Sequence, residues 1–170
     1  MTSAPSHALT IARPTIQTLT VLNLLYAASI SCLLAYSFLM PQWPRELFGD
    51  TMLGRYPNVG VGMRVIIVLG ILGAGVMHAL LRKLYAIVDT VRAGDPFSFE
   101  NARRLELVGW GVMALECLRM AAVAVLAATI VNRGFAEYSF APWLAALLIF
   151  VLAGVFAQGA RMRADLEGTV

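Results

Sequence analysis

The sequence is poor in charged residues, and it contains only two histidines, two cysteines and one lysine. Charged residues make up 14% of the chain, whereas soluble domains usually carry about 25%. So few histidines and cysteines exclude a haem held between intramembrane histidines, a zinc cluster or a redox pair. No nucleotide-binding loop and no nucleophile–base pair is readable. We therefore expect no cofactor, no metal and no enzymatic activity.

The few polar and ionisable residues are also scattered. Cys32 and Cys117 both fall inside apolar stretches, where we expect them to be small buried hydrophobic residues. The net charge of +3 comes from basic residues placed around apolar segments and not in one basic patch. This pattern gives no support for direct nucleic-acid binding.

Long apolar runs dominate what is present. Hydrophobic residues make up 59% of the 170-residue chain, and four stretches, at about 18–40, 65–81, 107–131 and 141–160, are each long enough to cross a bilayer as a helix. No segment alternates over ten residues as a barrel strand does. The sequence predicts an all-α integral membrane protein with a polar segment, 1–17, and one four-helix transmembrane domain, 18–170. Because the first run is longer than the apolar core of a signal peptide, we expect no cleavage.

The basic residues predict the orientation. If the N-terminus lies in the cytoplasm, eight basic residues fall on the cytoplasmic side and four on the other. The eight are Arg13, Arg82, Lys83, Arg92, Arg103, Arg104, Arg161 and Arg163, and the four are Arg45, Arg55, Arg64 and Arg133. This excess places both termini in the cytoplasm of a bacterial inner membrane.

The first outer loop, residues 41–62, carries Trp43, Phe48 and Tyr56. Aromatic residues suit the membrane interface, so we interpret the loop as anchored there, with a ligand-sensing loop as the alternative. The second outer loop, 132–140, is too short to form a domain.

The connector between the second and third spans has a helical pattern. Its apolar residues share one helical face: Leu81, Leu84, Tyr85, Val88 and Val91. The second helix is therefore predicted to extend into the cytoplasm to about Val91 or Arg92. Gly94 suits a helix C-cap, and the next helix is predicted to begin at Pro96 or after Ser98. The hairpin either packs only on itself or offers a docking surface to a partner.

The third span contains two opposite charges, Glu116 and Arg119, three residues apart. They can pair on one helix face, which should point into the bundle because charges facing lipid are costly. We expect a deep polar layer of Tyr26, Ser29, Glu116 and Arg119 and a shallower one of Asn23, His78 and Gln158. The pair is either a structural bridge or a ligand, proton or signal site, and His78 is expected to serve packing or to lie at the membrane interface.

Small residues four apart, such as Gly70 and Ala74, permit close contact between membrane helices. Such contacts form within one chain or between copies, so the sequence leaves a homo-oligomer open.

Two segments resemble a known family. The connector Gly94-Asp95-Pro96-Phe97 with Asn101, Arg103-Arg104-Leu105 and Gly109, and the ending Gly159–Arg163 with Asp165–Val170, resemble the uncharacterised bacterial family called domain of unknown function 2975 over about residues 15–170. The resemblance implies a four-helix inner-membrane protein. The family's genes often lie beside small helix-turn-helix regulators, which implies a membrane-bound controller of a DNA-binding protein. No site is established in the family.

We therefore expect a membrane-embedded sensor or regulatory protein that binds a cytoplasmic protein. The predicted docking residues are Asp95, Pro96, Phe97, Asn101, Arg103, Arg104, Arg161 and Arg163. The alternative is a small dimeric transporter that uses Glu116 to carry a proton or substrate. Against it, Arg119 favours an ionised Glu116, and no internal repeat or pair of broken helices marks a transport path.

Overall fold

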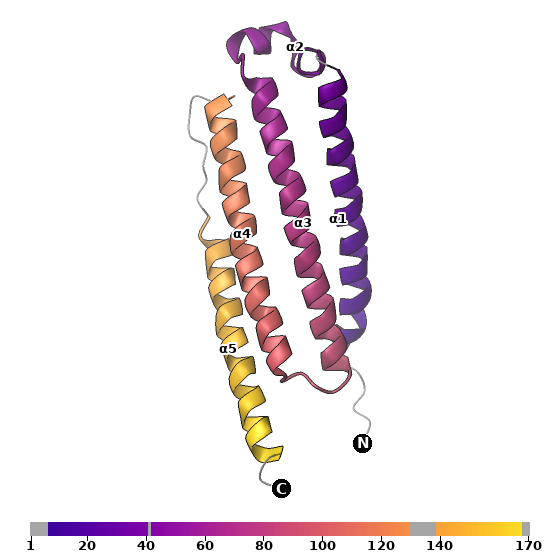
Figure 1. Cartoon of the computed structure of the whole chain (residues 1–170), viewed down its shortest axis with the longest axis vertical. Coiled ribbons are helices and arrows are strands. Elements are labelled where there is room, and N and C mark those ends of the chain that lie inside the picture. Colours follow the sequence, from indigo (N-terminus) through magenta and orange to yellow (C-terminus); the bar gives the residue numbers. More distant parts are fainter. Residues whose placement is uncertain (1–6, 41, 130–138, 168–170) are drawn as a thin grey trace.

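The computed structural model describes residues 7–40, 42–129 and 139–167, and these ranges contain five helices (Figure 1). The helices are α1 (His7–Leu39), α2 (Trp43–Arg55), α3 (Val59–Arg92), α4 (Phe99–Thr129) and α5 (Ala141–Glu167). Four of them, all except α2, are long and apolar enough to cross a membrane. The predicted all-helical class and the four candidate spans are confirmed.

The four long helices form an open row. Within the described ranges, α3 contacts α1 and α4, α5 contacts α4, and α2 touches α1 and α3. α1 does not pack against α4 or α5 in these ranges, so the four long helices do not close into a bundle. Large apolar side chains remain exposed along the row, such as Leu25 at 59% and Leu148 at 60%, which is the pattern of a protein whose solvent is lipid.

Two helices begin before their predicted spans. α1 runs from His7 through Pro14, whereas the predicted span begins at about residue 18. Pro14 lies inside α1, where a proline removes one backbone N–H donor and crowds the carbonyl four residues before it, yet the helix continues through it. α3 begins at Val59 and not at residue 65, so Arg64 lies inside the helix. The Arg64 Nη2 donates a hydrogen bond to the Ser37 carbonyl of α1 at 2.6 Å.

The segment predicted to be the first outer loop contains α2, a helix that the sequence interpretation did not predict. α2 bends at Gly49, which has a φ of 71°, a positive value that glycine adopts readily and other residues rarely do. Trp43 is 1% exposed, so its ring packs inside the protein. The Tyr36 hydroxyl donates to Glu46 Oε2 at 3.0 Å and ties α1 to α2. The second outer loop and the end of the third span lie mostly outside the described residues.

The hairpin between α3 and α4 agrees with its prediction. α3 continues to Arg92 and ends in a Schellman motif: the Asp95 N–H donates to the Thr90 carbonyl at 3.1 Å, and the Gly94 N–H to the Val91 carbonyl at 3.2 Å. Gly94 has a φ of +86°, which an L-residue rarely adopts. α4 begins after Ser98, whose Oγ accepts the Asn101 N–H at 3.2 Å as an N-cap.

α5 is displaced along the row. It starts near the middle of α4 and extends past the α3–α4 turn (Figure 1), and it continues to Glu167 beyond the predicted end at residue 160. The two cysteines are exposed on the helix surfaces, so the expectation that they are buried is wrong.

Candidate functional site

Asn101 lies at the centre of the α3–α4 hairpin and is fully buried. Its Nδ2 donates to the Thr90 hydroxyl at 2.7 Å and to the Pro96 carbonyl at 3.0 Å. Its Oδ1 accepts from Arg104 Nη1 at 3.0 Å. One amide side chain therefore fixes the end of α3, the turn and the first turns of α4.

The last turns of α5 close over this hairpin. Arg163 Nη1 lies 2.6 Å from Asp95 Oδ1. The Phe97 and Phe156 rings pack with their centroids 5.2 Å apart. A Cβ built on Gly159 would lie 2.8 Å from the Phe97 ring, so only glycine lets the ring approach α5 this closely. We call this assembly of Asp95, Phe97, Asn101, Phe156, Gly159 and Arg163 the clamp.

The clamp changes the interpretation of the predicted docking residues. Asp95 and Arg163 pair with each other, and Asn101 is buried. Six of the eight predicted residues make contacts within the chain: Asp95, Pro96, Phe97, Asn101, Arg104 and Arg163. Arg103 and Arg161 are exposed, and they remain available to a partner.

A second tie joins α1 to the extension of α3. Arg13 Nε donates to the Tyr85 hydroxyl at 2.6 Å, and Arg13 Nη2 lies 3.7 Å from Asp89 Oδ1. The sequence interpretation did not find this contact. The only signal was an acid, Asp89, in a segment otherwise rich in basic residues. The tie sets the position of α1 against α3 at the same end of the molecule as the clamp.

The predicted pair within α4 is confirmed. Arg119 Nε lies 2.8 Å from Glu116 Oε2, and Nη2 lies 2.6 Å from Oε1. Glu116 is 5% exposed, whereas 45% of the Arg119 side chain is exposed. Because both carboxylate oxygens are occupied by the guanidinium, Glu116 is held as half of a bidentate ion pair.

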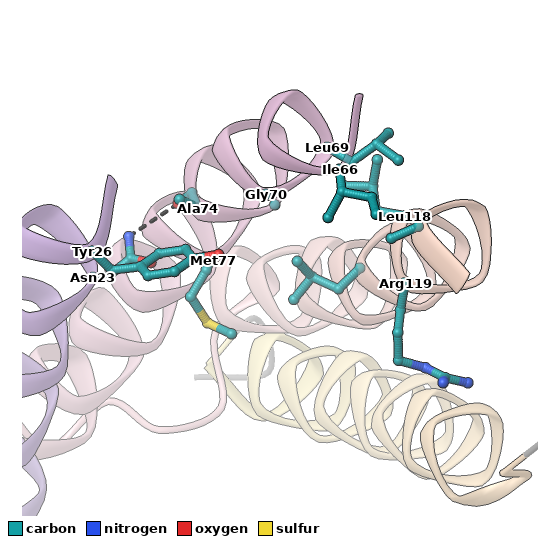
Figure 2. Close-up of a pocket in the computed structure, with 12 residues that line it drawn as sticks. Asn23, Tyr26, Ile66, Leu69, Gly70, Ala74, Met77, Leu118 and Arg119 are labelled. Atoms are coloured by element: carbon teal, nitrogen blue, oxygen red, sulfur yellow. Dashed lines mark hydrogen bonds between the residues drawn. The ribbon is translucent and has the colours of Figure 1, made fainter. Parts of the chain in front are cut away.

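A groove of about 370 Å³ lies along α3, between α1 and α4 (Figure 2). Gly70, Gly73 and Ala74 form its floor, and Asn23 and Tyr26 form one wall. Asn23 Nδ2 donates to the Ala74 carbonyl at 3.0 Å. The opposite wall consists of Leu115, Leu118, Arg119 and Ala122. The Arg119 guanidinium points away from Tyr26, so Arg119 contributes mainly its stem (Figure 2).

The predicted polar layers are therefore only partly present. Tyr26 and Arg119 line one groove as expected, and Asn23 belongs with them and not in a separate layer. Ser29 is exposed and donates to the Leu25 carbonyl of its own helix at 2.8 Å, so its assignment to this layer is wrong. His78 does not line the groove, and within the described residues its buried Nδ1 has no hydrogen-bond partner.

In the same ranges, no group of three or more His, Cys, Asp or Glu could hold a metal ion.

The ion pair predicts an asymmetry between single and double variants. Arg119→Leu leaves the nearly buried Glu116 carboxylate without its partner, whereas Glu116→Gln with Arg119→Leu removes both charges. We expect the single variant to lower the steady-state amount of membrane protein several-fold and the double variant to lower it less. Quantitative immunoblotting of membrane fractions measures both. Equal amounts of the single and double variants would show that the pairing does not stabilise the chain.

Comparison with known proteins gives one match. The family model described as "Protein of unknown function (DUF2975)" matches residues 13–170, which is most of the chain and includes the clamp. No curated protein and no solved structure matches the chain.

Proposed function

We propose a regulatory function for this chain, which belongs to the DUF2975 family of proteins of unknown function. In this proposal, the chain is embedded in the membrane and binds a cytoplasmic protein partner. One observation carries the proposal. The two segments that resemble the family, around residues 94–109 and 159–170, meet in the clamp through the Arg163–Asp95 ion pair and the Phe97–Gly159 contact. The distinctive residues are thus concentrated at one end of the row and do not follow a path across the membrane.

The clamp supports an exposed surface suited to a partner. A groove of about 550 Å³ lies between the start of α4 and α5, and Phe99, Arg103 and Glu106 line its α4 side. Its α5 side has small residues, Ala153, Gly154 and Ala157, which permit close approach of another helix. Phe99 is 55% exposed, and on α5 Met162, which follows Arg161 in the sequence, is 63% exposed. Exposed apolar side chains with basic neighbours favour a partner that offers an apolar face with acidic groups.

The proposed orientation places the clamp in the cytoplasm. It rests on the excess of basic residues at the clamp end of the row. The family resemblance implies a helix-turn-helix transcription regulator as the partner, so the chain acts on DNA through that protein and not directly. The groove beside Tyr26 is the corresponding candidate for sensing a signal within the membrane.

Transport remains the second candidate because of one observation. Glu116 is a nearly buried acid in the middle of an apolar helix, and such residues often serve ion pathways. Against this use, the carboxylate is held by two hydrogen bonds from Arg119. A proton or substrate carrier would have to break both in each cycle.

Site-specific photocrosslinking in native membranes tests the proposal. A photoreactive amino acid in place of Arg103 should give an adduct with a DNA-binding protein, because this side chain is exposed in the groove beside the clamp. The matched control replaces Leu47, which is 60% exposed on α2 at the opposite end of the row. The same adduct from both positions, or none from Arg103, would contradict the proposed partner surface and orientation.

A further inference from the structure

A third groove lies on the surface between α1 and the C-terminal half of α3. Its volume is about 530 Å³, which falls in the range of small-ligand sites. α1 contributes Gln17, Thr20 and Val21, and α3 contributes Leu81, Arg82, Tyr85 and Ala86. The groove is therefore apolar in its floor and polar along one edge.

The groove sits where α3 changes from apolar to charged. The apolar run of α3, in which His78 is the one polar residue, ends at Leu81, and Arg82 and Lys83 follow directly. In a helix that crosses a bilayer, this change marks the level of the lipid headgroups. Thus the apolar floor faces the acyl chains, whereas the polar edge lies at the depth of the phosphates.

Arg82 supplies the charge at this edge. It is exposed, and it is the one charged residue among those that line the groove. The neighbouring acid, Asp89, lies near Arg13, whose Nη2 is 3.7 Å from it. Arg13 also donates to the Tyr85 hydroxyl, so Tyr85 is held in place as a wall of the groove.

We propose that this groove binds one anionic phospholipid of the surrounding bilayer. The headgroup phosphate pairs with the Arg82 guanidinium, and Gln17 lies along the same polar edge. One acyl chain lies against Val21 and Leu81. A guanidinium beside an apolar groove matches the chemistry of a lipid, because the acyl chain fills the groove. A free phosphate would contact only the guanidinium. The bound lipid bridges α1 and α3 at the level of the Arg13–Tyr85 hydrogen bond.

The test compares lipid retention in matched variants. The full chain is reconstituted in phosphatidylcholine nanodiscs that contain phosphatidylglycerol, and retained lipid is measured by native mass spectrometry after detergent extraction. The wild-type chain should retain phosphatidylglycerol in preference to phosphatidylcholine. Arg82→Gln should lower this preference about fivefold, the effect of one basic residue of about 1 kcal/mol at a membrane surface.

Two further variants separate a built site from general attraction. Lys83→Gln removes the same charge at the same depth, but Lys83 does not line the groove, so the preference should be retained. Val21→Trp fills the groove without changing charge and should lower the preference as much as Arg82→Gln. An equal loss in Lys83→Gln and Arg82→Gln, or an unchanged preference in Val21→Trp, would overturn the proposal. Displacement of the lipid by inorganic phosphate alone would also overturn it, because the acyl chain would then contribute nothing.

Discussion

Asn101→Leu should destabilise the clamp strongly, by about 1–3 kcal/mol for each buried polar group that it leaves unpaired. The Pro96 carbonyl would lose its Asn101 donor, and the Thr90 hydroxyl would lose a close partner. Leucine has the same branched heavy-atom skeleton as asparagine but is bulkier, and it neither donates nor accepts a hydrogen bond. The unfolding temperature of the purified protein should fall by about 2–4 °C for each kcal/mol, as measured by thermal unfolding in detergent.

The matched control is Arg103→Leu, an exposed position two residues further along the same helix. Surface substitutions usually change stability by less than about 0.5 kcal/mol, so this variant should unfold close to the wild-type temperature. If Asn101→Leu and Arg103→Leu unfold at the same temperature, Asn101 does not hold the hairpin together.

The features that the sequence predicted correctly are local ones. The apolar residues from Leu81 to Val91 recur at helical spacing, and α3 continues to Arg92. Gly94 ends that helix because a positive φ is needed at the turn. Glu116 and Arg119 pair because residues three apart on a helix are neighbours whatever the rest of the chain does.

The features that it missed depend on contacts between distant segments. Asp95 and Arg163 lie 68 residues apart, and no periodicity connects them. Because that contact was not foreseen, Asp95 and Asn101 were interpreted as residues for a partner, although one is paired within the chain and the other is buried. The open row is likewise a property of how helices meet and not of any single helix.

α2 was missed for a different reason. Its sequence carries one proline, two glycines and charges of both signs, which are typical of a loop. Contacts with other parts of the chain hold α2 in place. Trp43 is 1% exposed, and Glu46 accepts a hydrogen bond from Tyr36 of α1.

The largest functional effect is expected from reversing the charge of the exposed surface beside the clamp. Arg103→Glu with Arg161→Glu changes two exposed side chains and leaves the Asn101 hydrogen bonds and the Arg163–Asp95 ion pair in place. The protein should therefore insert and accumulate normally, while an acidic partner face would be repelled. We expect loss of regulation as complete as that caused by deleting the gene. Glu116→Gln is the comparison, because it alters the intramembrane pair and not this surface.

Transcript profiling of a deletion strain complemented with each variant tests the central claim most directly. Genes whose transcripts change on deletion should return to their original level with the wild-type chain and with Glu116→Gln. They should stay changed with the Arg103→Glu, Arg161→Glu variant at equal membrane abundance. Full complementation by that double variant, together with loss of a solute flux in Glu116→Gln, would contradict a regulator acting through the clamp and favour a transporter.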